Sequence, residues 1–158
     1  MKVLDRTQEI GLEPQLFGDA GAFSVDLSLV SSNEFKEASS EEASLTVTGG
    51  CTWPISIDKS QLKRVLDNLI DNGLRHSESA TGQRTVDLHI GQSVVQRLCF
   101  IDVIDNGEGV PDSAQARLFE PFFTTRPDGT GLGLYLCKEL CESNKGRCAC
   151  CFRSAPSH

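Results

Sequence analysis

The side chains best suited to chemistry begin with two asparagines and an arginine at helical spacing. Asn68, Asn72 and Arg75 recur every three or four residues. An Asn amide oxygen can coordinate a hard cation without repelling a polyphosphate, and an Arg one turn further along suits a phosphate oxygen. A solvated polar helix face would show the same spacing, so this pattern needs support from elsewhere in the chain.

Two glycine-rich stretches provide that support. Asp105 opens the run Asp-Asn-Gly-Glu-Gly directly after an apolar segment, and its carboxylate could accept a hydrogen bond from the exocyclic amine that distinguishes adenine from guanine. The run 129–134, Gly-Thr-Gly-Leu-Gly-Leu, precedes a helical pattern, so backbone N–H groups and the positive end of the helix could face phosphates. Each motif is weak alone, because neither matches a phosphate-binding loop of the Gly-Lys-Ser/Thr type or a strand-borne dinucleotide fingerprint.

Regular elements are expected to position these motifs. A helix over 62–76 would place its apolar residues on one stripe and the Asn/Arg series on the next, with Asp58 as the N-cap. A polar loop is predicted at 77–83, strands at 85–90 and 96–104, a short helix at 112–118, a loop at 119–130, a helix at 131–143 and a last strand at 147–153.

The first third of the chain has weaker signals. Residues 1–17 are mixed and interrupted by Pro14, which predicts a linker, with the domain itself spanning 18–158. A loose helical period is present over 19–40. The β-rich runs 45–48 and 53–57 flank Gly49-Gly50, which predicts a hairpin.

Composition limits the class of protein. The 158 residues are 39% hydrophobic and 23% charged with a net charge of -7, which indicates one globular domain and gives no basic footprint for nucleic acid or anionic lipid. The sequence has no long apolar run and no signal-peptide core, so we expect a cytoplasmic domain without direct membrane contact, in a parent protein that could itself be an inner-membrane sensor.

The seven cysteines are an odd number in a chain without secretory features, which favours free thiols over a disulfide framework. Cys137 and Cys141 lie one helical turn apart, and three more follow at 148, 150 and 151. A zinc site is conceivable there, but cysteine more often serves as a small apolar core residue.

The order of the motifs is more informative than any one of them. An Asn-bearing helix, Asp105-x-Gly-x-Gly, the segment Phe119-Glu-Pro-Phe-Phe123 and the Gly-Thr-Gly-Leu-Gly-Leu run together resemble the catalytic ATP-binding domain of sensor histidine kinases. Gyrase-type, mismatch-repair and heat-shock chaperone ATPases belong to the same superfamily. The resemblance covers about residues 58–143. It implies a two-layer α/β sandwich of the Bergerat type, in which helices pack on one face of a mixed sheet and a mobile lid covers ATP.

The resemblance also implies roles for individual residues. Asn72 would be the Mg²⁺ ligand, Asn68 would support the metal and phosphates, and Arg75 would contact a phosphate. Asp105 would bind the adenine amine. The remaining ATP-binding residues it implies are His76 beside the adenine, Gly107 and Gly109 in the wall, Phe119 at the base of the lid, Arg126 in the lid, and Gly129, Thr130, Gly131, Leu132 and Gly133 in the hinge and phosphate cradle. For the phenylalanines of 119–123 plain core packing is the alternative, and for Arg126 a solvated lid charge.

Asn68 is a departure from the relatives that hydrolyse ATP. Those carry a Glu at this position as general base, so its absence favours transfer to a protein acceptor over hydrolysis. The family's acceptor is a His followed by an acidic residue, and neither His76, His89 nor His158 has that context. We therefore expect a domain that binds Mg-ATP but does not phosphorylate itself, and that donates the γ-phosphoryl group to a His on separate dimerisation helices.

Two rival functions remain open: a switch ATPase of the same fold, and a nucleotide-binding or scaffolding module without transfer activity. The resemblance implies a response regulator as partner and, because the dimerising helices are not in this sequence, a monomer. The stretch 131–144 is similar to the sensor kinases that regulate type IV pilus genes, which implies a response regulator that activates transcription. The C-terminal residues 147–158 lack the closing hairpin of that family, so an edge strand could be missing or replaced.

Overall fold

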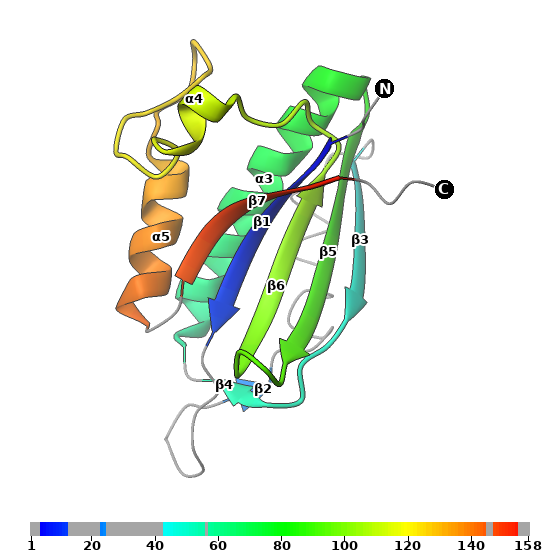
Figure 1. Ribbon diagram of the computed structural model, residues 1–158, viewed down its shortest axis with the longest axis vertical. Coiled ribbons are helices and arrows are strands. Elements are labelled where there is room, and N and C mark those ends of the chain that lie inside the picture. The colour runs from blue at the N-terminus through cyan, green and yellow to red at the C-terminus, as the bar shows by residue number, and fades with distance from the viewer. Residues whose placement is uncertain (1–3, 13–22, 25–42, 56, 145–146, 155–158) are drawn as a thin grey trace.

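A five-stranded mixed sheet forms one layer of the fold in the computed structural model (Figure 1). The structure describes residues 4–12, 23–24, 43–55, 57–144 and 147–154. The strand order is β3-β5-β6-β1-β7, with β3 parallel to β5 and every other pairing antiparallel. The strands are β1 (Leu4–Leu12), β3 (Ala43–Gly49), β5 (Arg84–Ser93), β6 (Leu98–Asp105) and β7 (Arg147–Ser154). The helices α3 (Lys59–Thr81) and α5 (Gly133–Ser143) pack against each other, α3 against β5 and β6 and α5 against β7. The predicted two-layer sandwich with a mixed sheet is thereby confirmed.

The predicted linker over residues 1–17 is wrong for residues 4–12. These residues form β1, which lies between β6 and β7 in the sheet. Ile10 is fully buried and Leu12 is 2% exposed, so this strand contributes to the core beneath the helices. The sequence signal was weak because polar residues fill the first half of the strand, where the alternation of a half-buried strand is hard to see.

The predicted hairpin at Gly49-Gly50 is also wrong. β3 pairs in parallel with β5, and the short strand β4 (Pro54–Ile55) pairs instead with β2 (Phe23–Ser24) in a separate two-stranded sheet. Gly49 has φ +82°, and a Cβ there would lie 1.9 Å from the carbonyl oxygen of Ile90. Gly50 donates its N–H to that same oxygen at 2.8 Å. The glycines therefore let the backbone run closely along β5 instead of reversing it.

α3 begins and ends at clear capping residues. Asp58 is the N-cap and accepts from the N–H of Gln61 at 3.1 Å, as predicted. Hydrogen bonds from the Ser60 hydroxyl and the Gln61 N–H lower the pKa of Asp58. The helix continues to Thr81 and ends at Gly82 in the left-handed conformation, so the polar loop predicted at 77–83 is wrong over most of its length. Ser77 is fully buried and hydrogen-bonds to the Thr85 hydroxyl at 3.0 Å, which draws this last turn onto β5.

The remaining elements follow the prediction more closely. The short helix α4 spans Asp112–Gln115, no regular element lies in 119–130, and α5 and β7 lie where a helix and a strand were expected. The helix predicted over 19–40 falls outside the described residues except at Phe23 and Ser24, which form β2. Among the described helices none is long and apolar enough to cross a bilayer.

The core lies between the sheet and the two long helices. The apolar stripe predicted for α3 is buried against strand residues of the helix-facing side, and the thiols of Cys99, Cys137 and Cys141 are buried with it. The five cysteines whose side chains are described are all free thiols; they are Cys51, Cys99, Cys137, Cys141 and Cys148. Because α3 is fixed on its apolar side, its neighbouring polar face is held rigidly at one end of the sheet.

Truncation of one buried leucine in α3 tests this packing. Leu66 is fully buried, so Leu66→Ala should lower the free energy of unfolding by about 2–5 kcal/mol through lost burial and the cavity left behind. Arg64, an exposed position of the same helix, provides the matched control, and Arg64→Ala should change stability by about 0.5 kcal/mol or less. Urea unfolding followed by circular dichroism measures both; equal effects of the two changes would contradict the assigned helix face.

Candidate functional site

A pocket of about 340 Å³ lies between α3, the segment that follows β6 and the loop that precedes α5. The side chains and glycines around it come from three separate parts of the sequence. They are Asn68, Asp71, Asn72, Arg75 and His76 from α3; Gly109, Val110, Pro111 and Leu118 after β6; and Phe123, Thr124, Thr125, Arg126, Gly129, Thr130, Gly131, Gly133 and Leu134 from the loop and the start of α5. The structure thus gathers the three predicted motifs around one cavity.

α3 supplies the polar wall of the pocket. Asn68 and Asn72 are half-buried and lie one turn apart, next to the apolar stripe. Arg75 lies three residues after Asn72, nearly one helical turn further along α3. It pairs with Asp71 at 2.9 Å, and both side chains are about half exposed. Two amide groups and a guanidinium therefore line one side of the cavity, where they could contact the oxygens of an anionic ligand or of a hydrated cation.

Asp105 lies at the end of β6 and directly behind this wall. It is 1% exposed, and its Oδ1 accepts from the N–H of Gly107 at 2.8 Å. Gly73 of α3 faces it so closely that a Cβ on Gly73 would lie 3.4 Å from the Cβ of Asp105 and 2.9 Å from Val86. Glycine at 73 therefore lets α3 approach the carboxylate. Gly107 likewise lets the backbone after β6 approach His76, because a Cβ on Gly107 would lie 3.0 Å from the Cβ of His76.

A loop from Phe119 to Gly131 forms the opposite wall, and its two ends are tied together. The N–H of Phe122 donates to the carbonyl of Gly131 at 3.0 Å. Both residues have positive φ, 66° and 73°, and a Cβ on Gly131 would lie 2.4 Å from the carbonyl carbon of Phe122. Only glycine fits at 131, and the Phe122 side chain projects outward with 75% of its surface exposed.

Inside the loop, short local contacts set its course. The Thr124 hydroxyl accepts from the Arg126 N–H at 3.1 Å, and Gly129 packs against the same hydroxyl. The guanidinium of Arg117 lies 4.7 Å from the centre of the Phe123 ring. Phe123 therefore lines the pocket while its other side is held by a cation.

α5 starts at the edge of the cavity with its positive end. Its first residue is Gly133, and its N-cap, Leu132, has no side-chain hydrogen bond to the helix. The glycines at 129, 131 and 133 all line the pocket. First-turn N–H groups and the helix dipole favour an anion at such a terminus.

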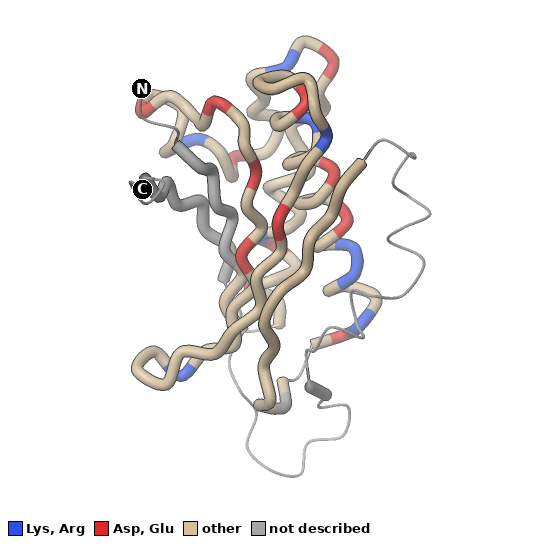
Figure 2. Tube along the Cα trace, turned by 90° about the vertical axis from the view of Figure 1, so that its right-hand side faces the viewer, with Lys and Arg blue, Asp and Glu red and all other residues tan. Residues whose placement is uncertain are grey.

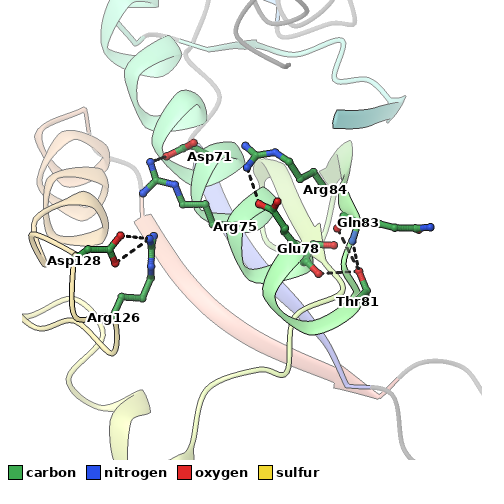
Figure 3. Close-up of polar contacts among 9 residues, drawn as sticks. Asp71, Arg75, Glu78, Thr81, Gln83, Arg84, Arg126 and Asp128 are labelled. Atoms are coloured by element: carbon green, nitrogen blue, oxygen red, sulfur yellow. Dashed lines mark hydrogen bonds and ion pairs between the residues drawn. The ribbon is translucent and has the colours of Figure 1, made fainter. Parts of the chain in front are cut away.

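Two ion pairs lie at the mouth of the pocket (Figure 3). Arg75 pairs with Asp71, and Arg126 pairs with both oxygens of Asp128 at 3.1 Å. Exposed pairs of this kind contribute only about 0–1 kcal/mol, so a phosphate group could displace either carboxylate at little cost. In the coloured part of the chain in Figure 2, Lys and Arg positions are interspersed with acidic ones, so these two local cations matter more than any extended basic surface.

A second cavity of about 560 Å³ continues from the first around the end of α3. It shares Arg75, His76, Gly109, Thr125 and Arg126 with the first and adds Glu78, Ser79, Ala80 and Glu108. The two cavities therefore adjoin each other, and both arginines belong to the part that they share.

Four of the predicted residues do not line the main pocket. Asp105 and Gly107 lie behind its wall, and Phe119 and Leu132 are also outside its lining. Eight described residues that line the pocket were not among the predicted site residues: Asp71, Val110, Pro111, Leu118, Phe123, Thr124, Thr125 and Leu134. Val110 and Pro111 directly follow the Asp-x-Gly-x-Gly run, so an apolar wall beside a polar motif was the available signal.

Comparison with known proteins identifies the family. Residues 57–157 match the family described as histidine kinase-, DNA gyrase B-, and HSP90-like ATPase. The chain is 52% identical over 91 residues to the sensor protein kinase PilS of Pseudomonas aeruginosa, covering 58% of this chain and 17% of that protein. It is 33% identical over 97 residues to the sensor protein kinase WalK of Staphylococcus haemolyticus, covering 58% of this chain and 16% of that protein.

Solved structures show the same fold. The mycobacterial sensor histidine kinase MprB superposes with a TM-score of 0.59 at 26% identity, covering 78% of this chain and 80% of that one. Full-length ShkA in complex with AMPPNP superposes with a TM-score of 0.60 at 23% identity, covering 90% of this chain and 33% of that one. The chain spans about a sixth of the length of the curated relatives PilS and WalK. From the match over residues 57–157, the chain belongs to the family of histidine kinase-, DNA gyrase B- and HSP90-like ATPases.

Proposed function

We propose that this chain is the ATP-binding catalytic domain of a two-component sensor histidine kinase, and that it donates the γ-phosphoryl group of ATP to a His on a separate dimerisation domain. The observation that carries the proposal is the single cavity lined by Asn68, Asn72 and Arg75 on one side and by the Gly129–Gly133 run on the other. The names of the relatives, which are sensor protein kinases, support it.

In this proposal the base of ATP lies toward Asp105. The carboxylate accepts the adenine amine, and His76 and Gly109 border the base. One carboxylate oxygen already holds the Gly107 N–H, so the orientation of the group is fixed before any ligand binds. Val110 and Pro111 offer an apolar surface for the ring.

The phosphates in turn lie between α3 and the start of α5. Arg75 and Arg126 exchange their carboxylate partners, Asp71 and Asp128, for phosphate oxygens. The backbone of 129–133 and the dipole of α5 face the same charge. Leu132 and Phe119 act indirectly in this proposal. Leu132 shapes the backbone of 129–133, and Phe119 anchors the loop from Phe119 to Gly131.

The residues present fit a magnesium ion bound together with nucleotide. Mg²⁺ prefers oxygen ligands and commonly keeps several waters while sharing substrate phosphates, so one or two protein oxygens suffice. Asn72 supplies one amide oxygen, with Asn68 one turn away to hold water or phosphate; no cluster of three His, Cys, Asp or Glu suited to a metal lies among the described residues. When bound, the ion would neutralise charge on the transferred phosphoryl group.

Transfer to protein is favoured over hydrolysis because the side chain at 68 is an amide. An amide cannot remove a proton from water, whereas a Glu at this position could. In this proposal the nucleophile that attacks the γ-phosphate is the imidazole of the acceptor, which needs no base at position 68. The acceptor histidine, the dimerisation helices that carry it and the response regulator that receives the phosphoryl group are all proposed to lie on other domains or proteins.

We further propose a membrane-associated sensor as the parent protein and a transcription-activating response regulator as its partner. The 52% identity with the sensor protein kinase PilS supports this narrower assignment to kinases that control type IV pilus genes. The domain boundary at residue 18 is replaced in the proposal by one that includes β1, since that strand lies inside the sheet.

An isosteric change of Asp105 tests the adenine site. Asp105→Asn keeps the shape and can still accept the Gly107 N–H, which leaves the amide NH₂ directed at the base. The amide NH₂ of Asn would then face the exocyclic NH₂ of adenine, so affinity for a non-hydrolysable ATP analogue with Mg²⁺ should fall about 10- to 100-fold. The loss should be smaller for the guanine analogue, because guanine has a carbonyl oxygen in place of that amine. Isothermal titration calorimetry measures both; equal losses for the two bases would place the base elsewhere.

A methyl group at Gly131 tests the loop. Gly131→Ala forces a Cβ to within 2.4 Å of the Phe122 backbone at a φ of +73°, so the loop must shift and affinity for the ATP analogue should fall at least about tenfold. The matched control is Gly50→Ala, because a Cβ there meets no atom within 4 Å and the residue lies outside the pocket. A Gly131→Ala protein that binds like wild type would contradict the loop's part in the site.

The direction of phosphoryl transfer can be measured with γ-labelled ATP. The chain alone should incorporate no label and release little free phosphate, because Asn68 provides no general base and no His is followed by an acidic residue. Label should appear on a phosphoacceptor domain supplied separately from the 52% identical relative. Rapid phosphate release by the chain alone would favour a switch ATPase, and nucleotide binding without any transfer would favour a scaffolding module.

A further inference from the structure

The strand β1 holds the end of β6, although it lies outside the part of the sequence that matches the family. The family match covers residues 57–157, whereas β1 spans Leu4–Leu12. In the sheet this strand separates β6 from β7 and pairs with both (Figure 1). Among the described strands, β1 is the only one that pairs with β7. The sheet is therefore completed by residues that precede the family-matched span.

The register places β1 directly beside Asp105. Arg6 is the β1 residue opposite Asp105, and Val86 of β5 is opposite it on the other side. Gly73 of α3 faces the same residue from the helical layer, where a Cβ would lie 3.7 Å from the Oδ2 of Asp105. The end of β6 is thus held between two strands and beneath a helix. Of these three supports, only β1 comes from outside residues 57–157.

The two ends of β1 are anchored differently. At the end remote from Asp105, Ile10 is fully buried in the core and Leu12 is 2% exposed. The other half of the strand has five polar residues in succession, 5–9, so its sequence offers no apolar side chain for burial. Strand ends held mainly by backbone hydrogen bonds open at a low free-energy cost, whereas core positions open only with the fold. Opening of β1 should therefore begin at the end beside Asp105.

We propose that β1 is a positioning strand of the nucleotide site. Paired along its first half, it holds Asp105 in the geometry that adenine needs; opened there, it lowers the affinity for adenine nucleotides. The inference rests on the proposed function, which places the base at Asp105. The described residues that line the two cavities all lie between Asn68 and Leu134, so β1 acts on the ligand through Asp105. In the proposed parent protein, a segment joined before β1 would pull on this half first, which gives an upstream domain a direct means of changing nucleotide affinity.

Thermodynamic linkage makes this coupling measurable from the side of the strand. If pairing of β1 raises the affinity for nucleotide by some factor, bound nucleotide stabilises that pairing by the same factor. Nucleotide should therefore slow the exchange of backbone amide hydrogens in residues 4–9, a segment remote in sequence from the cavity lining. A strand that contributes only to the general stability of the fold would show no such selective protection.

Hydrogen exchange on the unmodified chain tests this linkage. A non-hydrolysable ATP analogue with Mg²⁺ should slow amide exchange in residues 4–9 at least about fivefold, and the GTP analogue, which lacks the amine that Asp105 accepts, should slow it less. The tip of the β5–β6 hairpin lies at the opposite end of the sheet, with Val94 73% and Val95 95% exposed, and should exchange equally fast with and without nucleotide. Unchanged exchange in 4–9 of a protein that calorimetry shows to bind the analogue would overturn the inference. A chain that binds no nucleotide would contradict the proposed function instead.

A proline in the first half of β1 tests the same coupling by calorimetry. Thr7 pairs with Ile104, the residue before Asp105, and proline at position 7 removes a hydrogen bond inside the sheet. Thr7→Pro should bind the ATP analogue at least about fivefold more weakly and the GTP analogue nearly as before, because only adenine uses the carboxylate. Thr7→Val keeps the backbone N–H and is the matched control, which should bind both analogues like wild type.

Equal losses for both nucleotides in a folded Thr7→Pro protein, or no loss for either, would overturn the positioning role. If Thr7→Pro does not fold, the exchange experiment on the unmodified chain decides alone.

Discussion

The close approach of α3 to the end of β6 is the constraint on which the rest of the site depends. Gly73 allows it, because any side chain there would meet Val86 and then Asp105. The approach buries a carboxylate beneath a helix whose next face presents Asn68 and Asn72 to the cavity. A core contact and a binding geometry are thus set by one glycine: a wider gap would admit water around Asp105 and turn the two asparagines away from the loop that faces them.

The opposite wall is built on a different principle. α3 is held by burial, but the loop from Phe119 to Gly131 is held by one backbone hydrogen bond, two residues at positive φ and contacts between exposed side chains. Such contacts are individually weak, so this wall can open at a low free-energy cost while the helix cannot. In the proposed function, a rigid wall that selects the nucleotide and a loosely tied wall that admits it suit a site that nucleotide enters and leaves in every catalytic cycle.

The sequence predicted what local patterns and the order of motifs could determine. The buried stripe of α3, the Asp58 cap, strands β5 and β6 and the grouping of three distant motifs all follow from periodicity or resemblance. The pairing partners of the strands could not be predicted in this way. The two glycines at 49 and 50 suggest a turn, but in the structure their backbone runs against Ile90. β1 was missed because its polar first half hides a strand that is recognisable only from its neighbours, β6 and β7. Apolar residues of the pocket wall, such as Val110 and Leu118, cannot be distinguished from core residues in a sequence. Only the position of the cavity shows that their side chains line a pocket.

Charge balance explains how an acidic protein could bind the polyanion proposed as its ligand. The chain carries a net charge of -7, yet each arginine at the pocket already has an acidic neighbour within its own segment, Asp71 or Asp128. These carboxylates hold the guanidinium groups near the cavity without burying them, so little desolvation is needed when phosphate replaces carboxylate. In the proposed function the overall negative field also opposes non-specific anions, which would lack the adenine contact and the metal ion that accompany a Mg-nucleotide. Affinity should then depend on several groups engaging together, so that free phosphate alone competes poorly with a complete Mg-nucleotide for the same arginines.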